Sequence, residues 1–329
     1  MNDLFKIFQE LSNNSSGFKD TILVEGIPKK GDHKIGVSKE GLPLFFISTK
    51  DKSNNAIDIN LKSIQVAFQK DCELISEAGD KSKGVFTVVS LKSDSEDIIK
   101  YFVNTMHYLI NQLDITPSFA QIKAELNNLV NLFRSLSKPA KKTIQGLWTE
   151  LLFINQSHAI EYVIQSWHQL KNDRYDFNDG IDKVEIKSTC KNDRIHRFSL
   201  TQLQDIKDTF VFIGSTFTIE TGRGVTANDL IESIKEKISD HSLMLKIHNS
   251  VAEIMGDEFE RIFDVYFDYN LALNSVLYFD SREIPKISSK AISNEMSNVK
   301  YDCNLNHVNS IKEEEVSSQL LKALFSKHV

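Results

Sequence analysis

Cysteine, proline and glycine are scarce in this chain of 329 residues, which contains three Cys, five Pro and 13 Gly. The cysteines, Cys72, Cys190 and Cys303, lie far apart and form no CxxC pair, which excludes a disulfide framework and a zinc ribbon. With 41% apolar and 26% charged residues, the composition is that of a folded globular protein and excludes a fibrous or disordered chain.

Long apolar runs are also missing. No stretch approaches the roughly 18 consecutive apolar residues that a membrane-spanning helix needs, so we expect no membrane partner. Residues 1–6 include an acid and do not open an apolar segment of the signal-peptide kind. Since the unpaired cysteines suit a reducing compartment, these absences together predict a cytoplasmic protein.

Positive charge is not in excess either. Lys and Arg number 39 against 45 Asp and Glu, so the formal net charge is −6. A protein that coats nucleic acid by bulk charge is basic overall, and this balance excludes that class. Any contact with DNA therefore requires a local basic patch or the help of metal ions.

The length of the chain, and a change along it from strand-like to helical residue patterns, predict two domains. We expect residues 1–115 to form a β-rich domain, because short β-branched and aromatic segments follow one another between about residues 20 and 93. A short amphipathic helix over residues 4–11 is expected ahead of them. Nothing in this first domain suggests chemistry.

Residues 116–329 alternate between helical and strand-like patterns, which predicts an α/β (α+β) domain with a small sheet flanked by helices. Helical patterns fill about residues 95–157. Strand-like segments follow at residues 174–177, 182–189 and 210–217, and the Asn178-Asp-Gly turn between the first two predicts a hairpin.

A C-terminal α/β extension, from about residue 221 onward, carries no motif. Capping patterns predict helices that begin at Thr226, with Asp229 as the cap partner, and at Ser310, with Glu313 in that role. Strands are expected at residues 264–267 and 275–279.

The chemistry is expected at the hairpin. In the strand from Lys183, period-two alternation puts Val184 and Ile186 on one face and Glu185 and Lys187 on the other. Hairpin pairing brings Asp176 next to Glu185. Two carboxylates form a hard-oxygen site for Mg²⁺, and the ammonium beside them suits phosphodiester hydrolysis, in which a metal-activated water attacks the phosphate.

Two further polar residues are expected to point at this site. The apolar stripe of the helix before the hairpin leaves Glu150 off the stripe, with Gly146 one turn earlier on the same side, so Glu150 supplies a third carboxylate. Gln202 follows the strand near residues 196–198, in a segment that we expect to begin a short helix, and it reaches toward a metal-bound water or a phosphate oxygen.

The order of these blocks resembles the PD-(D/E)xK nuclease superfamily. The blocks are Gly-Leu-Trp-x-Glu-Leu, Arg-Tyr-Asp-Phe, Val-Glu-Ile-Lys-Ser-Thr and Ser-x-x-Gln-Leu, within about residues 142–203. Tyr175 stands where the motif has proline. Within the superfamily, the chain is similar to the branch found in bacterial restriction–modification and phage-defence operons. The resemblance implies a restriction-endonuclease-like core, a mixed central sheet flanked by helices that binds Mg²⁺.

The same resemblance implies a role for each residue of the motif region, residues 146–203. Asp176, Glu185 and Glu150 would bind the metal, Lys187 would be the catalytic lysine, and Gln202 the accessory polar residue. Mg²⁺ would be the cofactor, with Mn²⁺ able to substitute.

A basic cluster follows the catalytic strand. We expect its members to contact DNA phosphates, although a solvated loop is the alternative: Lys191, Arg194, His196 and Arg197. Trp148 and Trp167 are expected in the core, and His158 and His168 on the surface.

The sequence thus predicts a Mg²⁺-dependent DNA endonuclease of the restriction type acting on double-stranded DNA. Two alternatives stay open: a repair or recombination nuclease that acts on ends or branched DNA, and a non-catalytic DNA-binding subunit of a phage-defence complex. The expected protein partners are a second copy of the chain, as a homodimer, and a methyltransferase or ATPase/helicase from the same operon.

Overall fold

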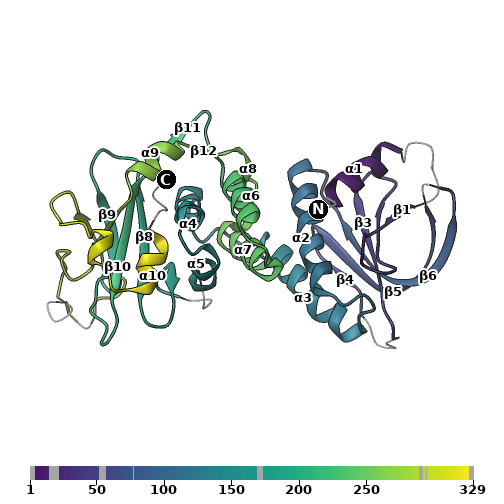
Figure 1. Cartoon of the computed structure of the whole chain (residues 1–329), viewed down its shortest axis with the longest axis horizontal. Helices are drawn as coiled ribbons and strands as arrows, with labels where there is room; N and C mark the ends of the chain where they lie inside the picture. The colour runs from purple at the N-terminus through teal and green to yellow at the C-terminus, as the bar shows by residue number, and fades with distance from the viewer. Residues whose placement is uncertain are drawn as a thin grey trace. The chain divides into compact units, whose positions relative to one another are not determined.

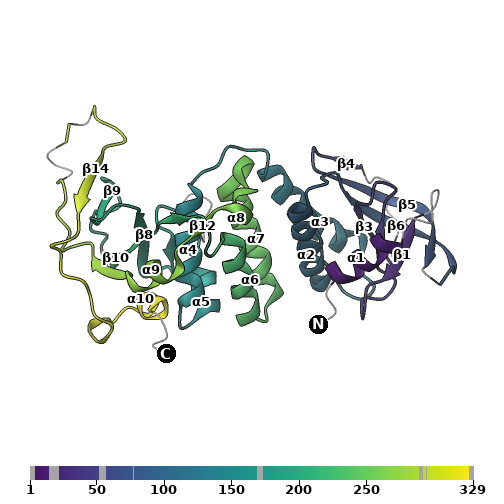
Figure 2. The same ribbon diagram turned by 90° about the horizontal axis from the view of Figure 1, so that it is seen from above.

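The computed structural model describes residues 4–14, 22–51, 57–76, 78–168, 173–288, 292–293 and 295–325. It divides the chain into two compact units, of which the first comprises residues 1–139 and 244–260 and the second residues 140–243 and 261–329. Each unit is drawn in Figures 1 and 2. Both combine helices with sheets, so the expected mixed α/β class is confirmed at that level.

The first unit is built on one sheet with strand order β1-β2-β3-β6-β5-β4, in which β1 also pairs with β5 and closes the sheet on itself. Its strands are β1 (Leu23–Gly26), β2 (Lys34–Val37), β3 (Pro43–Ser48), β4 (Ile59–Asn60), β5 (Ile64–Ser76) and β6 (Lys81–Leu91). These six strands lie in the region where short β-branched and aromatic segments follow one another in the sequence.

Three helices accompany this sheet: α1 (Leu4–Asn14), α2 (Glu96–Gln112) and α3 (Phe119–Ser135). Neighbouring residues of β3 pack into two different hydrophobic cores, because successive side chains of a strand point to opposite faces of the sheet. Phe45 meets Phe102 of α2, which in turn meets Phe133 of α3, with ring centroids 5.7 and 5.8 Å apart. Phe46 points to the opposite face of the sheet and packs there with Val24, Leu74 and Phe86.

This unit extends beyond the division at residue 115 that we expected from the sequence. It takes in α3 and the part of α7 (His241–Met255) from Met244 onward. The reason is local: the Tyr101 hydroxyl of α2 donates to the backbone carbonyl of His248 at 2.9 Å, and the Asp257 N–H donates to the Lys138 carbonyl at 2.8 Å. Hydrogen bonds between segments that are far apart in the chain have no local sequence pattern, so this boundary could not be predicted from the sequence.

The second unit has a mixed sheet with strand order β13-β10-β8-β7, in which only β8 and β10 run parallel. Its strands are β7 (Phe177–Asn178), β8 (Lys183–Thr189), β10 (Val211–Phe217) and β13 (Leu277–Asp280). Two further pairs stand apart: β9 (Ile195–Ser199) with β14 (Lys300–Asn304), and β11 (Glu220–Thr221) with β12 (Tyr266–Phe267).

Different elements cover the two faces of this sheet. Helix α4 (Ile144–Gln156) lies against β8 on one face (Figure 1). Phe153 of α4 and Ile186 of β8 pack so closely on Gly214 of β10 that any larger residue there would place its Cβ within 2.8 Å of both side chains. On the opposite face, Ile213 and Phe279 pack with Phe198 of β9 and Cys303 of β14. One helical layer and one two-stranded layer therefore enclose the sheet.

The remaining helices of the second unit are α5 (Ile160–Ser166), α6 (Ala227–Lys237), α8 (Arg261–Asp264), α9 (Tyr269–Asn274) and α10 (Gln319–Leu324). The capping box of Thr226 and Asp229 at the start of α6 is confirmed. The helix expected from Ser310 is wrong, because Glu313–Glu315 form a 3-10 turn and Ser318 caps α10 instead. Residues 264–267 divide between the end of α8 and β12 rather than forming one strand. No helix in the described ranges is long and apolar enough to span a membrane.

Candidate active site

The β7–β8 hairpin brings Asp176 near Glu185. The register pairs Phe177 with Val184 and Asn178 with Lys183, and Asp176 lies in the bend just before β7, close enough for its charge to act on Glu185. The Ile186 N–H donates to Asp176 Oδ2 at 2.7 Å and fixes the carboxylate. Gly180, with a φ of +92°, supplies the left-handed turn conformation that a β-carbon would disfavour. The expected hairpin is present, but its first strand, β7, is limited to Phe177–Asn178 instead of the expected residues 174–177, so Asp176 lies just before it.

Glu150 of α4 reaches the same place and is almost fully buried, with 2% exposure. Its Oε2 accepts hydrogen bonds from Trp167 Nε1 and from His168 Nε2, both at 2.8 Å. Trp167 is buried as expected. His168, expected on the surface, is half-buried and bonded to Glu150, because the bridge between Trp167 and Phe177 brings this segment alongside the hairpin.

Lys142 is a member of the site that sequence reasoning missed. Its Nζ donates to Glu150 Oε1 at 2.5 Å and also to Asp176 Oδ1. The residue lies just ahead of α4, whose N-cap is Thr143. No motif spacing marks it, since only the fold brings the loop before α4 to the hairpin.

A second cluster surrounds Glu185. Its Oε1 accepts from Lys187 Nζ at 2.8 Å and from Gln202 Nε2 at 2.5 Å. Gln202 Oε1 accepts from the Ser199 N–H at 2.9 Å, which orients the amide. Residues 200–203 form a turn rather than the expected helix, and this turn still directs Gln202 to the site. The Lys187 ammonium also lies 5.3 Å from the centroid of the Phe198 ring.

Burial and mutual repulsion disturb the ionisation of these carboxyl groups. Burial, reinforced by the charge of Asp176, raises the pKa of Glu185 to about 7. Burial and the charge of Glu150 likewise raise the pKa of Asp176. Burial acts in the same direction on Glu150, but the Lys142 ammonium and the His168 hydrogen bond outweigh it and lower the pKa of Glu150 to about 2. Burial and repulsion therefore outweigh the nearby cations at Glu185 and Asp176, whereas the cations outweigh burial at Glu150.

Three ligand atoms stand close enough to hold a metal ion. These atoms, one each from Glu150, His168 and Asp176, all lie within 4.8 Å of one another. Carboxylate oxygens suit Mg²⁺ and Mn²⁺, and an imidazole nitrogen adds affinity for Mn²⁺ and other transition metals. Glu185 is outside this group of three, although the charge of Asp176 acts on it. The donors thus fit a divalent cation, with His168 added to the residues expected from sequence.

The basic cluster separates into two pairs. Arg194 and His196 are buried, with 7% and 3% exposure, and both bond to the Ser215 hydroxyl, at 2.9 and 2.7 Å. His196 points into the unit because β9 alternates inward and outward residues, and Arg194, just before β9, is directed inward by its bonds to Ser215, so the expectation that they contact DNA is corrected. Lys191 and Arg197 are exposed, and Arg197 Nε donates to Asp302 at 2.8 Å.

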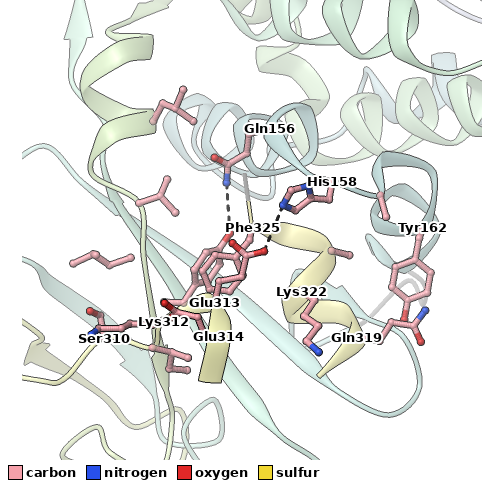
Figure 3. Close-up of a pocket in the computed structure, with 17 residues that line it drawn as sticks. Gln156, His158, Tyr162, Ser310, Lys312, Glu313, Glu314, Gln319, Lys322 and Phe325 are labelled. Carbon is pink, nitrogen blue, oxygen red and sulfur yellow. Dashed lines mark hydrogen bonds and ion pairs between the residues drawn. The ribbon is translucent and has the colours of Figure 1, made fainter. Parts of the chain in front are cut away.

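A large cavity lies elsewhere in the second unit (Figure 3). It measures about 1240 Å³, and its lining includes Tyr162, Tyr278, Lys322 and Phe325. His158 and Glu313 also line it, and His158 Nε2 lies 3.6 Å from Glu313 Oε1. None of the residues in the carboxylate clusters lines this cavity, so the chemistry expected from the sequence belongs to a separate place.

One family model matches residues 4–306, which is nearly the whole chain, and its description reads "Putative PD-(D/E)XK family member, (DUF4420)". No curated protein and no solved structure matches the chain significantly. The match reaches far beyond the motif region, residues 146–203, and includes the first unit, so the family is defined by both parts of the molecule.

Proposed function

The chain belongs to this PD-(D/E)XK family, and from that premise we propose that it is a Mg²⁺-dependent DNA endonuclease of the restriction type. The observation that carries the proposal is the convergence of Glu150, Asp176 and Glu185 with Lys187. Three buried carboxylates at one place are costly to fold, because each loses its hydration. A cation that binds there offsets this cost.

The proposed ligands of the cation are Asp176 and Glu150, with His168 beside them and Glu185 as the next carboxylate. When bound, a divalent cation supplies positive charge at the scissile phosphate and lowers the pKa of a coordinated water. The Ile186 N–H and the Trp167 indole hold Asp176 and Glu150 in place. Such outer partners keep ligands oriented and sharpen metal binding.

Lys187 stabilises the negative charge that develops on the phosphate oxygens during attack. Its ammonium is held by Glu185 Oε1 at 2.8 Å and by Gln202 Oε1 at 3.4 Å, so it is oriented before the substrate arrives. Water adds across one P–O bond. Its oxygen joins the phosphorus to leave a 5′-phosphate, and the departing 3′ oxygen takes a proton to become a hydroxyl.

Contacts to the duplex are proposed for Lys191 and Arg197, the exposed members of the basic cluster, which lie on the segment that follows β8. Phosphate contacts of this kind position the duplex and carry no sequence information. A role in restriction or phage defence further predicts that cleavage depends on DNA modification, with a methyltransferase or an ATPase/helicase as partner.

The first prediction is that the protein cuts closed-circular duplex DNA in Mg²⁺, and that Lys187→Ala reduces the rate by about a hundredfold or more. Lys183→Ala is the matched control. Lys183 lies four residues earlier on the same strand and donates to Asn178 rather than to a carboxylate of the site. The rate of plasmid linearisation measures the effect, with methylated and unmethylated plasmids side by side.

Cleavage by Lys187→Ala at the rate of Lys183→Ala would show that the proposed site is wrong. Digestion of linear DNA alone, with circles left intact, would favour a nuclease that acts on ends.

A further inference from the structure

The protein provides its own cation at the proposed metal site. Lys142 Nζ bonds to Glu150 Oε1 and to Asp176 Oδ1 at the same time. These two residues also belong to the group of three whose ligand atoms lie within 4.8 Å of one another. The ammonium therefore lies among the atoms that would coordinate a divalent ion.

The remaining oxygens of the two carboxylates are already engaged by the protein. Glu150 Oε2 accepts from Trp167 and His168, each at 2.8 Å. Asp176 Oδ2 accepts from the backbone N–H of Ile186 at 2.7 Å. Hence the two oxygens that the scaffold leaves for a cation are the two that Lys142 binds.

Lys142 is attached to the fold differently from the carboxylates that it bridges. Glu150 stands on α4, and Asp176 is fixed to the β7–β8 hairpin, so both are carried by regular elements. Lys142 lies in the turn ahead of α4, and 32% of its side chain is exposed. Its flexible four-carbon stem lets the ammonium move into solvent while Glu150 and Asp176 stay in place.

We propose that Lys142 is a displaceable internal counter-ion that competes with the divalent metal for Glu150 Oε1 and Asp176 Oδ1. This inference rests on the proposed metal site and adds to it a residue that sets metal affinity. In the absence of metal, the ammonium neutralises two buried carboxylates and stabilises the fold. When a divalent cation binds, the ammonium leaves, so part of the intrinsic metal affinity is spent on displacing it.

The alternative is a permanent structural role, in which Lys142 holds Glu150 and Asp176 together whether or not metal is present. The two roles predict opposite effects of removing the ammonium. A competitor raises metal affinity when it is removed, because the apparent dissociation constant equals the intrinsic one divided by the fraction of molecules with an open site. A permanent organiser lowers metal affinity when it is removed.

The test is calorimetric titration of Mn²⁺ into the full chain, as wild type, Lys142→Met and Lys141→Met. Methionine keeps the unbranched stem and removes the charge. Lys141→Met is the matched control, because Lys141 is the exposed neighbouring lysine and its removal changes the net charge equally. We expect Lys142→Met to bind Mn²⁺ about tenfold more tightly than both other proteins, in line with the fraction of closed sites in the wild type.

Thermal melting gives a second readout. Without metal, Lys142→Met should melt below Lys141→Met, because two buried carboxylates lose their counter-ion. Saturating Mn²⁺ should then raise its melting temperature more than it raises that of the wild type. If Lys142→Met does not fold without metal, Lys142→Gln keeps a hydrogen-bond donor at this position without the charge and is titrated in its place, with the same expectation.

Equal or weaker Mn²⁺ binding by the neutral variants than by Lys141→Met would overturn the role of Lys142 and leave the metal site standing. If neither the wild type nor any variant bound Mn²⁺, the result would contradict the proposed function itself.

Discussion

The two units bury different kinds of polar group. Among the described residues, the buried polar side chains of the first unit are His33, Thr87, Thr105 and His248, and none of these is a carboxylate or a guanidinium. The second unit buries four carboxylates and an arginine: Glu150, Asp176, Asp182, Glu185 and Arg194. Among the described residues, buried charge is thus concentrated in the unit that carries the candidate active site.

This contrast reflects the physics of burial. An ionised group loses its hydration inside a protein, and nearby charges of the same sign add repulsion. The raised pKa values of Asp176 and Glu185 record both effects. The described part of the first unit avoids this penalty and is stabilised by aromatic packing, whereas the second unit buries charged groups at the site that we propose binds a cation. The difference implies that substitutions in the core of the first unit change stability without changing metal affinity.

The largest effect on stability is expected from the first unit. Phe45 is fully buried and packs edge-on against Phe102, so Phe45→Ala should lower the free energy of unfolding by about 3–5 kcal/mol. Mn²⁺ affinity should stay at the wild-type value, since all of the proposed ligands lie in the second unit. Chemical denaturation and calorimetric titration of the same variant measure the two quantities.

A reciprocal variant sharpens the comparison. Asp176→Asn should abolish Mn²⁺ binding while it changes the metal-free unfolding free energy by no more than about 1 kcal/mol, because it also removes a buried charge. If Phe45→Ala weakened metal binding tenfold, the separation between the two units would be incorrect.

A smaller effect is expected at Trp167, which is buried and donates to Glu150 Oε2. Trp167→Phe should weaken Mn²⁺ binding by about 10–100-fold, as is typical when a partner that orients a ligand is lost. Trp148→Phe is the control, because Trp148 is equally buried but donates to the Val225 carbonyl at 2.9 Å. The two variants should lose similar stability, and similar Mn²⁺ affinities would contradict the orienting role of Trp167.

The last pair of effects concerns pH. Burial lowers the pKa of His33 in the first unit and of His196 in the second to about 4, well below the ordinary value of 6.5. The unfolded chain therefore takes up protons first as the pH falls, so the stability contributed by each neutral histidine is complete above pH 6.5 and is lost toward pH 4. His33→Asn should accordingly reduce proton uptake on unfolding by about one between pH 4 and 6.5.

Glu185 gives the second unit an opposing dependence. Its folded pKa of about 7 exceeds the ordinary 4.5, so its contribution to stability is complete below pH 4.5 and is lost as the pH rises through 7. Denaturation in chelator across pH 4–8 compares His33→Asn with Glu185→Gln. Their pH slopes should change in opposite directions relative to wild type, and a change of the same sign would contradict these assignments.

The elements around the motif could be predicted well, because local rules govern them. Asn178-Asp-Gly demands a tight turn, and period-two alternation then fixes the faces of Glu185 and Lys187. Thr226 with Asp229 is a local cap and forms as expected. Aromatic and β-branched runs likewise identify the β-rich first unit.

What could not be predicted depends on tertiary contacts. Lys142 and His168 join the site only because the loop ahead of α4 and the segment after α5 fold against the hairpin. Arg194 and His196 look like a basic patch in sequence, but both side chains are directed inward and bond to Ser215. The C-terminal helix α10 is capped by Ser318, eight residues after the predicted cap at Ser310, because the Ser318 side chain accepts from the Leu321 N–H next to the apolar residues of this helix.

The most direct test of the central claim is an anomalous difference map from crystals of the full chain grown with Mn²⁺. The account predicts a Mn²⁺ peak within coordination distance of Asp176 and Glu150, with the Lys142 ammonium moved away from both. A map in which Mn²⁺ binds elsewhere, while Lys142 still bridges the two carboxylates, would contradict it.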